Sequence, residues 1–111
     1  MKRIVLLICI VVLAISLVGC GSKEVVPDYS DAASFEAALN AGEDLVGKTV
    51  KFTVKEFVPN SAFGYNAQAG EHLNFCSPNN PKISTGDTVI ADVEEVTSVL
   101  GSWIISYKVI G

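Results

Sequence analysis

Residues 49–55, Thr-Val-Lys-Phe-Thr-Val-Lys, alternate strictly between apolar and polar side chains. Successive side chains of a β-strand point to opposite faces, so this period of two predicts a half-buried strand. Val50, Phe52 and Val54 would then face a core, while the lysines face water. Pro59-Asn60 is expected to end the strand, because proline cannot donate to the hydrogen-bond ladder. The centre of the chain is therefore predicted to form β-structure.

Four more segments with strand character follow toward the C-terminus. They are expected over residues 62–67, 72–76, 88–96 and 102–110. Gly70, the turn-rich run 77–81, the pair 86–87 and Gly101 separate them, and Gly64 is a candidate bend. Alternate residues of the last two segments predict buried faces made of Val89, Ala91 and Val93, and of Trp103, Ile105, Tyr107 and Val109.

One helix is expected before the strands, over residues 31–41. Apolar residues recur at helical spacing on one face, namely Ala32, Phe35, Ala38 and Leu39. Ser30 or Asp31 can cap its first turn, because a side-chain oxygen there accepts from a free backbone N–H. Gly42 suits the left-handed residue that ends a helix.

The order of one helix and five short strands predicts a mainly β domain, a small five-stranded OB-like barrel with one N-terminal α-helix. The sequence resembles the tRNA-anti-like OB-fold family of secreted bacterial lipoproteins. The resemblance is carried by the expected helix at 31–41 and by residues 45–50 and 86–89, which lead into the first and fourth strands. The hydrophobic last strand also matches. It spans about residues 30–110 and implies the barrel fold. A fold label transfers no tRNA function.

This chain departs from the ordinary OB-fold between the third and fourth strands. A helix usually lies there, but only about ten residues, 77–86, are available and many of them form turns. We therefore expect no helix in that segment. The helix at 31–41 is expected to cover the end of the barrel instead.

The N-terminus has the form of a secretory signal. Lys2 and Arg3 precede an apolar run of about 15 residues, which is shorter than the roughly 20 residues that span a bilayer. The run ends in Leu17-Val18-Gly19-Cys20, which resembles the cleavage motif of bacterial lipoproteins. The resemblance implies cleavage before Cys20 and a diacylglyceryl group on its thiol. An ordinary secretory signal with a chance cysteine and an uncleaved anchor helix are the alternatives.

These segments predict the organisation and the location of the protein. Residues 1–19 would be the signal peptide, 20–29 the lipidated N-terminus and tether, and 30–111 the OB-like domain. The protein would be held by lipid at the extracytoplasmic face of the cell membrane. The family resemblance suggests a Gram-positive host.

Charge and cysteine content narrow the function of the mature chain. The formal net charge is −4, and removal of Lys2 and Arg3 with the signal makes it −6 with no arginine left. Nucleic-acid binding is not expected, because it needs clustered cations that release counterions from phosphates. Cys9 would leave with the signal and Cys20 would be lipidated. Cys76 would then have no partner for an intrachain disulfide.

The expected second strand carries the candidate ligand face, formed by Phe63, Tyr65 and Asn66. OB-folds bind ligands on the face of strands two and three, where aromatic rings stack on sugars, bases or peptide side chains. The segments 60–61 and 77–81 would flank this face. The alternative is that these residues belong to the barrel core.

Catalytic and metal-binding groups are sparse. His72, Asn74 and Cys76 share one side of a strand, but His72 and Cys76 would lie about 13 Å apart, too far for a hydrogen bond. Cys76 is therefore interpreted as a structural thiol, with an intermolecular disulfide or a redox role as the alternative. A zinc site would need three or four ligands, and Asp87, Asp92, Glu94 and Glu95 fit a solvated strand face better than a calcium site. No cofactor, metal or catalytic residue is predicted.

Three functions are compatible with these observations. The first is a non-enzymatic binding module that contacts an envelope protein, peptide or glycan, with an exposed aromatic patch near Phe63 and Tyr65. The second is a structural or assembly-accessory lipoprotein, with an exposed apolar surface and no pocket. The third is an enzyme that uses Cys76 and His72.

Overall fold

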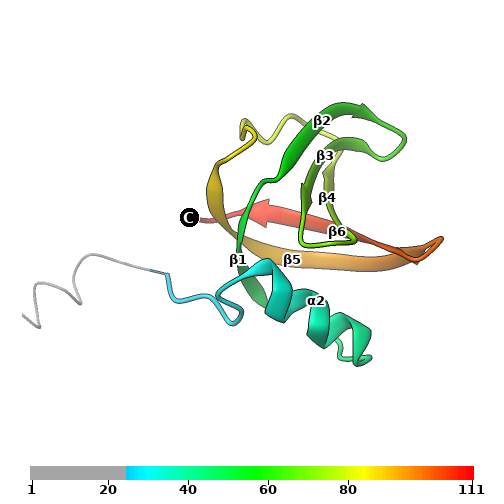
Figure 1. Cartoon of the computed structure of the whole chain (residues 1–111). Helices are drawn as coiled ribbons and strands as arrows, with labels where there is room; N and C mark the ends of the chain where they lie inside the picture. Colours follow the sequence, from blue (N-terminus) through cyan, green and yellow to red (C-terminus); the bar gives the residue numbers. More distant parts are fainter. Residues whose placement is uncertain (1–24) are drawn as a thin grey trace, which may run out of the picture.

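A computed structural model describes residues 25–111, which form one helix and a curled six-stranded sheet (Figure 1). The predicted signal peptide, the predicted cleavage motif Leu17-Val18-Gly19 and the predicted lipidation site Cys20 lie outside the described residues. The elements in chain order are α2 (Ala32–Asn40), β1 (Thr49–Thr53), β2 (Glu56–Ser61), β3 (Gly64–Ala69), β4 (Leu73–Ser77), β5 (Thr88–Val99) and β6 (Ser102–Val109).

The sheet has the strand order β1-β5-β6-β4-β3-β2, so two consecutive strands lie at its opposite edges. All neighbours pair antiparallel except β4 and β6, which are parallel. The chain changes partners between β1 and β2. Val54 N–H donates to the Asp87 carbonyl at 2.8 Å, whereas the next residue, Lys55, donates to the Gln68 carbonyl at 2.8 Å. This change of partner bends the chain and curls the sheet (Figure 1).

The expectation of five strands is wrong at the first strand. The sequence predicts one strand from Thr49 that ends at Pro59, but β1 ends at Thr53 and β2 continues through Pro59 to Ser61. Pro59 is tolerated because β2 is an edge strand and its pairing with β3 is irregular between Val58 and Ser61. Alternation continues past the end of β1 through Val54 and Lys55 and stops only at Glu56, so the pattern does not mark where β1 ends.

The other four predicted strands are present, with ends shifted by up to three residues. Two-residue turns join β2 to β3 at residues 62–63 and β5 to β6 at residues 100–101. The segment between β4 and β5 contains no helix, as the sequence predicts. The predicted mainly β class is thus confirmed, with a curled six-stranded sheet in place of the five-stranded arrangement.

The core lies on the inner face of the curl. The rings of Phe52 on β1 and Phe75 on β4 stack with centroids 3.9 Å apart and an interplanar angle of 5°. Tyr107 meets Phe75 edge-on at 5.6 Å, and Phe35 of α2 reaches the same ring at 6.0 Å. The predicted inward faces of β1, β5 and β6 are confirmed, because their alternate apolar residues are buried or pack against the core.

The helix is attached to the sheet by a buried carboxylate that the sequence pattern does not predict. Asp31 caps α2 by accepting from Ser34 N–H at 2.7 Å, and Gly42 follows with a φ of +84°, both as expected. Glu36 is buried and accepts from the backbone N–H groups of Glu71 and His72 at 2.8 and 2.9 Å. α2 is therefore tied to the turn between β3 and β4.

Candidate functional site

A groove of about 360 Å³ lies between the tips of the β2–β3 and β5–β6 hairpins. The β2–β3 turn contributes Ala62 and Phe63, and the β5–β6 turn contributes Leu100. The strands behind the turns contribute the floor, made by Asn66, Asn74 and Ile104. Within residues 25–111, the lining of this groove includes no charged side chain. The groove is therefore suited to an uncharged, partly apolar ligand.

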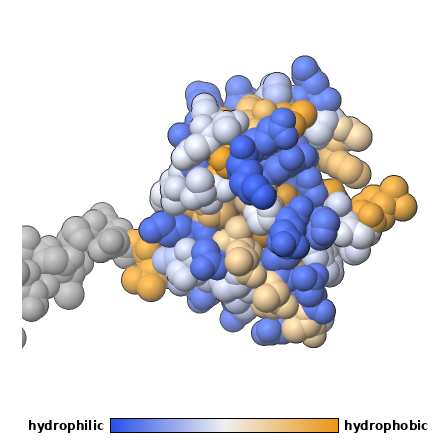
Figure 2. Space-filling view, in the orientation of Figure 1, coloured by the Kyte–Doolittle hydropathy of each residue, from blue (hydrophilic) through white to orange (hydrophobic). Residues whose placement is uncertain are grey.

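Two large apolar side chains at the rim are exposed to water. Phe63 is 47% exposed and Leu100 is 100% exposed. In Figure 2 a hydrophobic prominence lies at the end of the molecule where Figure 1 places the β5–β6 turn. Side chains exposed in this way do not contribute to the core. Exposed apolar side chains that cluster on a surface often mark a site of contact with another molecule.

Leu100 is also held in an unfavourable backbone conformation. Val99 pairs with Ser102, and the two residues between them have φ values of +51° for Leu100 and +81° for Gly101. A two-residue hairpin turn with positive φ at both positions favours Asn-Gly, since only Gly and Asn tolerate this region well. A leucine there costs about 1 kcal/mol relative to a tolerant residue. Folding does not explain why leucine occupies this position.

The floor of the groove is a chain of oriented amides. Asn74 Nδ2 donates to the Trp103 carbonyl at 3.1 Å, and Asn66 Nδ2 donates to Asn74 Oδ1 at 3.1 Å. The Trp103 carbonyl can only accept, so it sets the orientation of both amides. Asn66 is buried, and its Oδ1 is left without a hydrogen-bond donor. A buried unpaired acceptor is uncommon and costs free energy.

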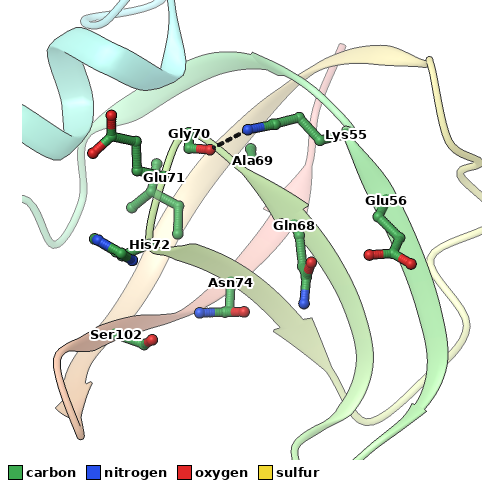
Figure 3. Close-up of a pocket in the computed structure, with 10 residues that line it drawn as sticks. Lys55, Glu56, Gln68, Ala69, Gly70, Glu71, His72, Asn74 and Ser102 are labelled. Atoms are coloured by element: carbon green, nitrogen blue, oxygen red, sulfur yellow. Dashed lines mark hydrogen bonds between the residues drawn. The ribbon is translucent and has the colours of Figure 1, made fainter.

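A second, polar hollow of about 390 Å³ adjoins the groove (Figure 3). The two hollows share Asn74 and Ser102. Glu56, Gln68 and Asn74 are cross-strand partners, so they form a polar row over β2, β3 and β4. Lys55 Nζ donates to the Gly70 carbonyl at 2.9 Å, which is drawn as a dashed line in Figure 3. The outer face thus changes from apolar at the hairpin tips to polar near the β3–β4 turn.

The structure brings together two of the three predicted ligand-face residues. Phe63 and Asn66 line the groove, but Tyr65 does not. Tyr65 stacks on Phe57 with centroids 6.3 Å apart, and it lies on the opposite side of β3 from Asn66. Sequence reasoning missed Leu100 and Asn74. The signal for Leu100 was available, because Leu-Gly replaces the Asn-Gly expected of such a turn.

Cys76 and His72 are not placed as a reacting pair. Cys76 is buried, and burial raises the pKa of its thiol to about 11, so it is protonated at neutral pH. His72 is exposed and precedes β4, and its backbone N–H is bound by Glu36. A thiolate is the nucleophilic form of cysteine, so this environment opposes reactivity.

Residues 25–111 contain no group of three or more His, Cys, Asp or Glu side chains placed to hold a metal ion. In the same part of the chain, no helix has the length and hydrophobicity needed to cross a membrane.

Comparison with known proteins identifies no relative: no family model, no curated protein and no solved structure matches this chain.

Proposed function

We propose that this protein is a membrane-anchored extracytoplasmic lipoprotein that binds a protein partner through the groove between its two hairpin tips. Lipid on Cys20 would hold the mature chain at the membrane of a Gram-positive cell, with no catalytic role for Cys76 or His72. The anchor is supported by the motif Leu17-Val18-Gly19-Cys20 behind a short apolar run. Two acyl chains retain a protein on a membrane far better than one.

We further propose that the sheet is a variant of the OB barrel in which β1 and β2 together form the first strand. The observed partners support this assignment, because β1 pairs with β5 while β2 pairs with β3. The parallel pair β4–β6 would correspond to the third and fifth strands. In this frame the groove lies on the face and between the loops that OB-folds use for ligands.

One observation carries the binding proposal: Leu100 is fully exposed and has a positive φ. A residue that is unfavourable for the backbone and buries nothing contributes little to folding, so its value must lie in contact with something else. Phe63 across the groove would provide the second apolar contact, and the Asn66–Asn74 floor would provide hydrogen bonds.

The lining favours a protein segment over a glycan. The rim has one aromatic ring, and its other apolar groups are the aliphatic side chains of Val99, Leu100 and Ile104. Aliphatic groups bury apolar side chains well, whereas sugar binding relies on flat aromatic faces. A purely structural accessory role is less favoured, because an apolar surface without a hollow would serve it and a groove is present here.

A substitution of Leu100 tests this proposal, because its effects on stability and on partner affinity should have opposite signs. Leu100→Asn should raise the free energy of unfolding by about 1 kcal/mol, because asparagine tolerates the positive φ. The same change should weaken partner binding by about tenfold or more, since a central apolar contact is worth over 1 kcal/mol. Val46→Asn is the matched control, because Val46 is 52% exposed and does not line the groove.

The partner is found with a photo-crosslinking amino acid placed at Leu100 or at Val46 in the lipidated protein in living cells. A partner crosslinked from position 100 is then purified, and its affinity for wild type, Leu100→Asn and Val46→Asn is measured. Equal affinities for the three proteins would contradict the proposal. Binding of cell-wall glycan fragments that perturbs the Asn66 and Asn74 amide signals would replace the protein segment with a glycan.

A further inference from the structure

A shallow apolar hollow of about 490 Å³ lies where the tether joins the domain. Its apolar lining comes from Val25, Val26 and Pro27 of the tether, from Ile90 on β5 and from Ile110. Val26 is 85% exposed and Ile110 is 40% exposed. We call Val25, Val26, Ile90 and Ile110 the tether patch.

The tether patch is held in place by hydrogen bonds on both sides. Asp28 N–H donates to Thr49 Oγ1 at 2.9 Å, and Thr49 N–H donates to the Asp28 carboxylate at 2.9 Å. Tyr29 bridges to Val50 alongside β1. Ile110 N–H donates to the Ile90 carbonyl at 2.8 Å, which fixes the C-terminal side. The hydrogen bonds of Asp28 and Tyr29 therefore fix the end of the tether against β1.

The position of the patch relative to Cys20 identifies what covers it. Five residue steps separate Cys20 from Val25, so the chain reaches at most about 17 Å between them. A lipid on Cys20 would thus keep the tether patch within a short distance of the bilayer surface. Lys51 is the one charged side chain lining this hollow within residues 25–111.

The two apolar regions lie at opposite ends of the molecule. In Figure 1 the tether and the C-terminus leave at one end, and the β2–β3 and β5–β6 turns lie at the other. Figure 2 shows hydrophobic surface next to the grey trace and again at the far tip. A domain that rests on its tether patch would therefore present the hairpin groove away from the membrane.

From this arrangement, and resting on the lipid anchor of the proposed function, we propose that the tether patch lies against the lipid bilayer. Val26 and Ile110 would sit at the boundary between headgroups and acyl chains, as the apolar side of an interfacial segment does. Lipidation alone would leave the domain free to rotate, and the patch would restrict it to one orientation.

The experiment uses the lipidated full-length protein, purified from membranes and reconstituted into vesicles of equal parts phosphatidylglycerol and phosphatidylethanolamine. Spin labels are placed through Ile110→Cys and, at the far end, through Leu100→Cys. Cys76 is buried with a raised thiol pKa, and wild type treated with the label controls for its reaction. Collision of each label with oxygen in the bilayer and with a water-soluble nickel complex is measured.

We expect the Ile110 label to lose severalfold in nickel accessibility and to gain oxygen accessibility on reconstitution, while the Leu100 label stays unchanged. Ile110 is decisive because it lies 90 residues from Cys20 along the chain, so proximity in sequence cannot bring it to the membrane. An Ile110 label as accessible to nickel as the Leu100 label would overturn the proposal.

Further measurements distinguish the ways in which the tether-patch proposal could fail. Mass spectrometry of the same sample reports the diacylglyceryl group, and its absence would refute the anchor together with the inference that rests on it. A lipidated protein with a water-exposed Ile110 label would refute the tether patch alone. Nickel protection of the Ile110 label in Cys20→Ser protein without vesicles would indicate a second copy of the chain in place of lipid, and would overturn the proposal.

Discussion

The inner and outer faces of β4 differ in what their side chains do. Leu73 and Phe75 point inward and are almost completely buried among apolar groups. Asn74 and Cys76 point outward, and Asn74 takes part in a chain of amides that ends in an unpaired acceptor. The inner face is explained by packing alone. The outer face carries polar groups that packing of the core does not require, and Asn66 and Asn74 among them line the groove that we propose as a binding site.

The largest expected loss of stability comes from a substitution on the inner face of β4. Phe75→Ala should lower the free energy of unfolding by about 3–5 kcal/mol, because it removes the ring between Phe52, Phe35 and Tyr107 and leaves a cavity. Urea unfolding followed by Trp103 fluorescence measures this loss. The same truncation at the exposed Phe63 is the control and should cost less than about 1 kcal/mol. Similar losses at both positions would erase the distinction between the two faces.

The next largest loss of stability is expected when the attachment of α2 to the sheet is removed. Glu36→Ala leaves the backbone N–H groups of Glu71 and His72 without their acceptor, at a cost of about 2–3 kcal/mol. Glu36→Gln keeps one acceptor oxygen and should cost less. Glu43→Ala, at an exposed position after the helix, serves as control in the same unfolding assay. A Glu36→Ala protein as stable as the control would mean that the helix is held by Phe35 and Leu39 alone.

A smaller effect is expected from the amide floor on the outer face. Asn66→Leu should change the free energy of unfolding by no more than about 1 kcal/mol, because it removes both a hydrogen bond and an unpaired buried acceptor. Its effect should appear in binding of the partner, which is measured alongside stability. A large loss of stability would assign Asn66 to the fold and remove the main polar feature of the groove.

The smallest expected effect is on the pH dependence of the free energy of unfolding. Burial raises the pKa of Cys76 to about 11 from its ordinary 9.0, so the unfolded chain loses this proton at a lower pH than the folded one. The stability from the neutral buried thiol is thus complete below pH 9.0 and is lost as pH rises toward about 11. Cys76→Ser should flatten the fall in unfolding free energy over this interval.

Tyr107 should contribute a second pH-dependent change in the free energy of unfolding. Burial, and then the nearby Cys76, raise the pKa of Tyr107 to about 12 from 10.0, so its contribution is lost over a higher interval. Its hydroxyl is buried without a hydrogen-bond partner, and Tyr107→Phe should therefore leave stability at neutral pH unchanged or slightly raised. A marked loss at neutral pH would show that the hydroxyl has a partner.

Local pattern was sufficient for most of the elements. The period of two between Thr49 and Val54 and the helical spacing of Phe35 and Leu39 predict which side chains are buried, because burial of one face is the main source of stability in a half-exposed element. The Asp31 cap and the left-handed Gly42 follow from the requirements of a helix end. These properties depend on residues a few positions apart.

The strand break, the composition of the groove and the burial of Glu36 depend on contacts between distant parts of the chain. The break between β1 and β2 arises because Val54 and Lys55 bond to different strands, although both residues still continue the alternation of β1. Tyr65 and Asn66 are adjacent in sequence and point to opposite faces of β3, yet only the pairing of the strands brings Asn66 to the same groove as Leu100, 34 residues further on. Glu36 is buried because two free N–H groups from a remote turn reach it. Pairing and register, which place remote residues together, are set by the whole chain at once and leave no periodic trace in its sequence.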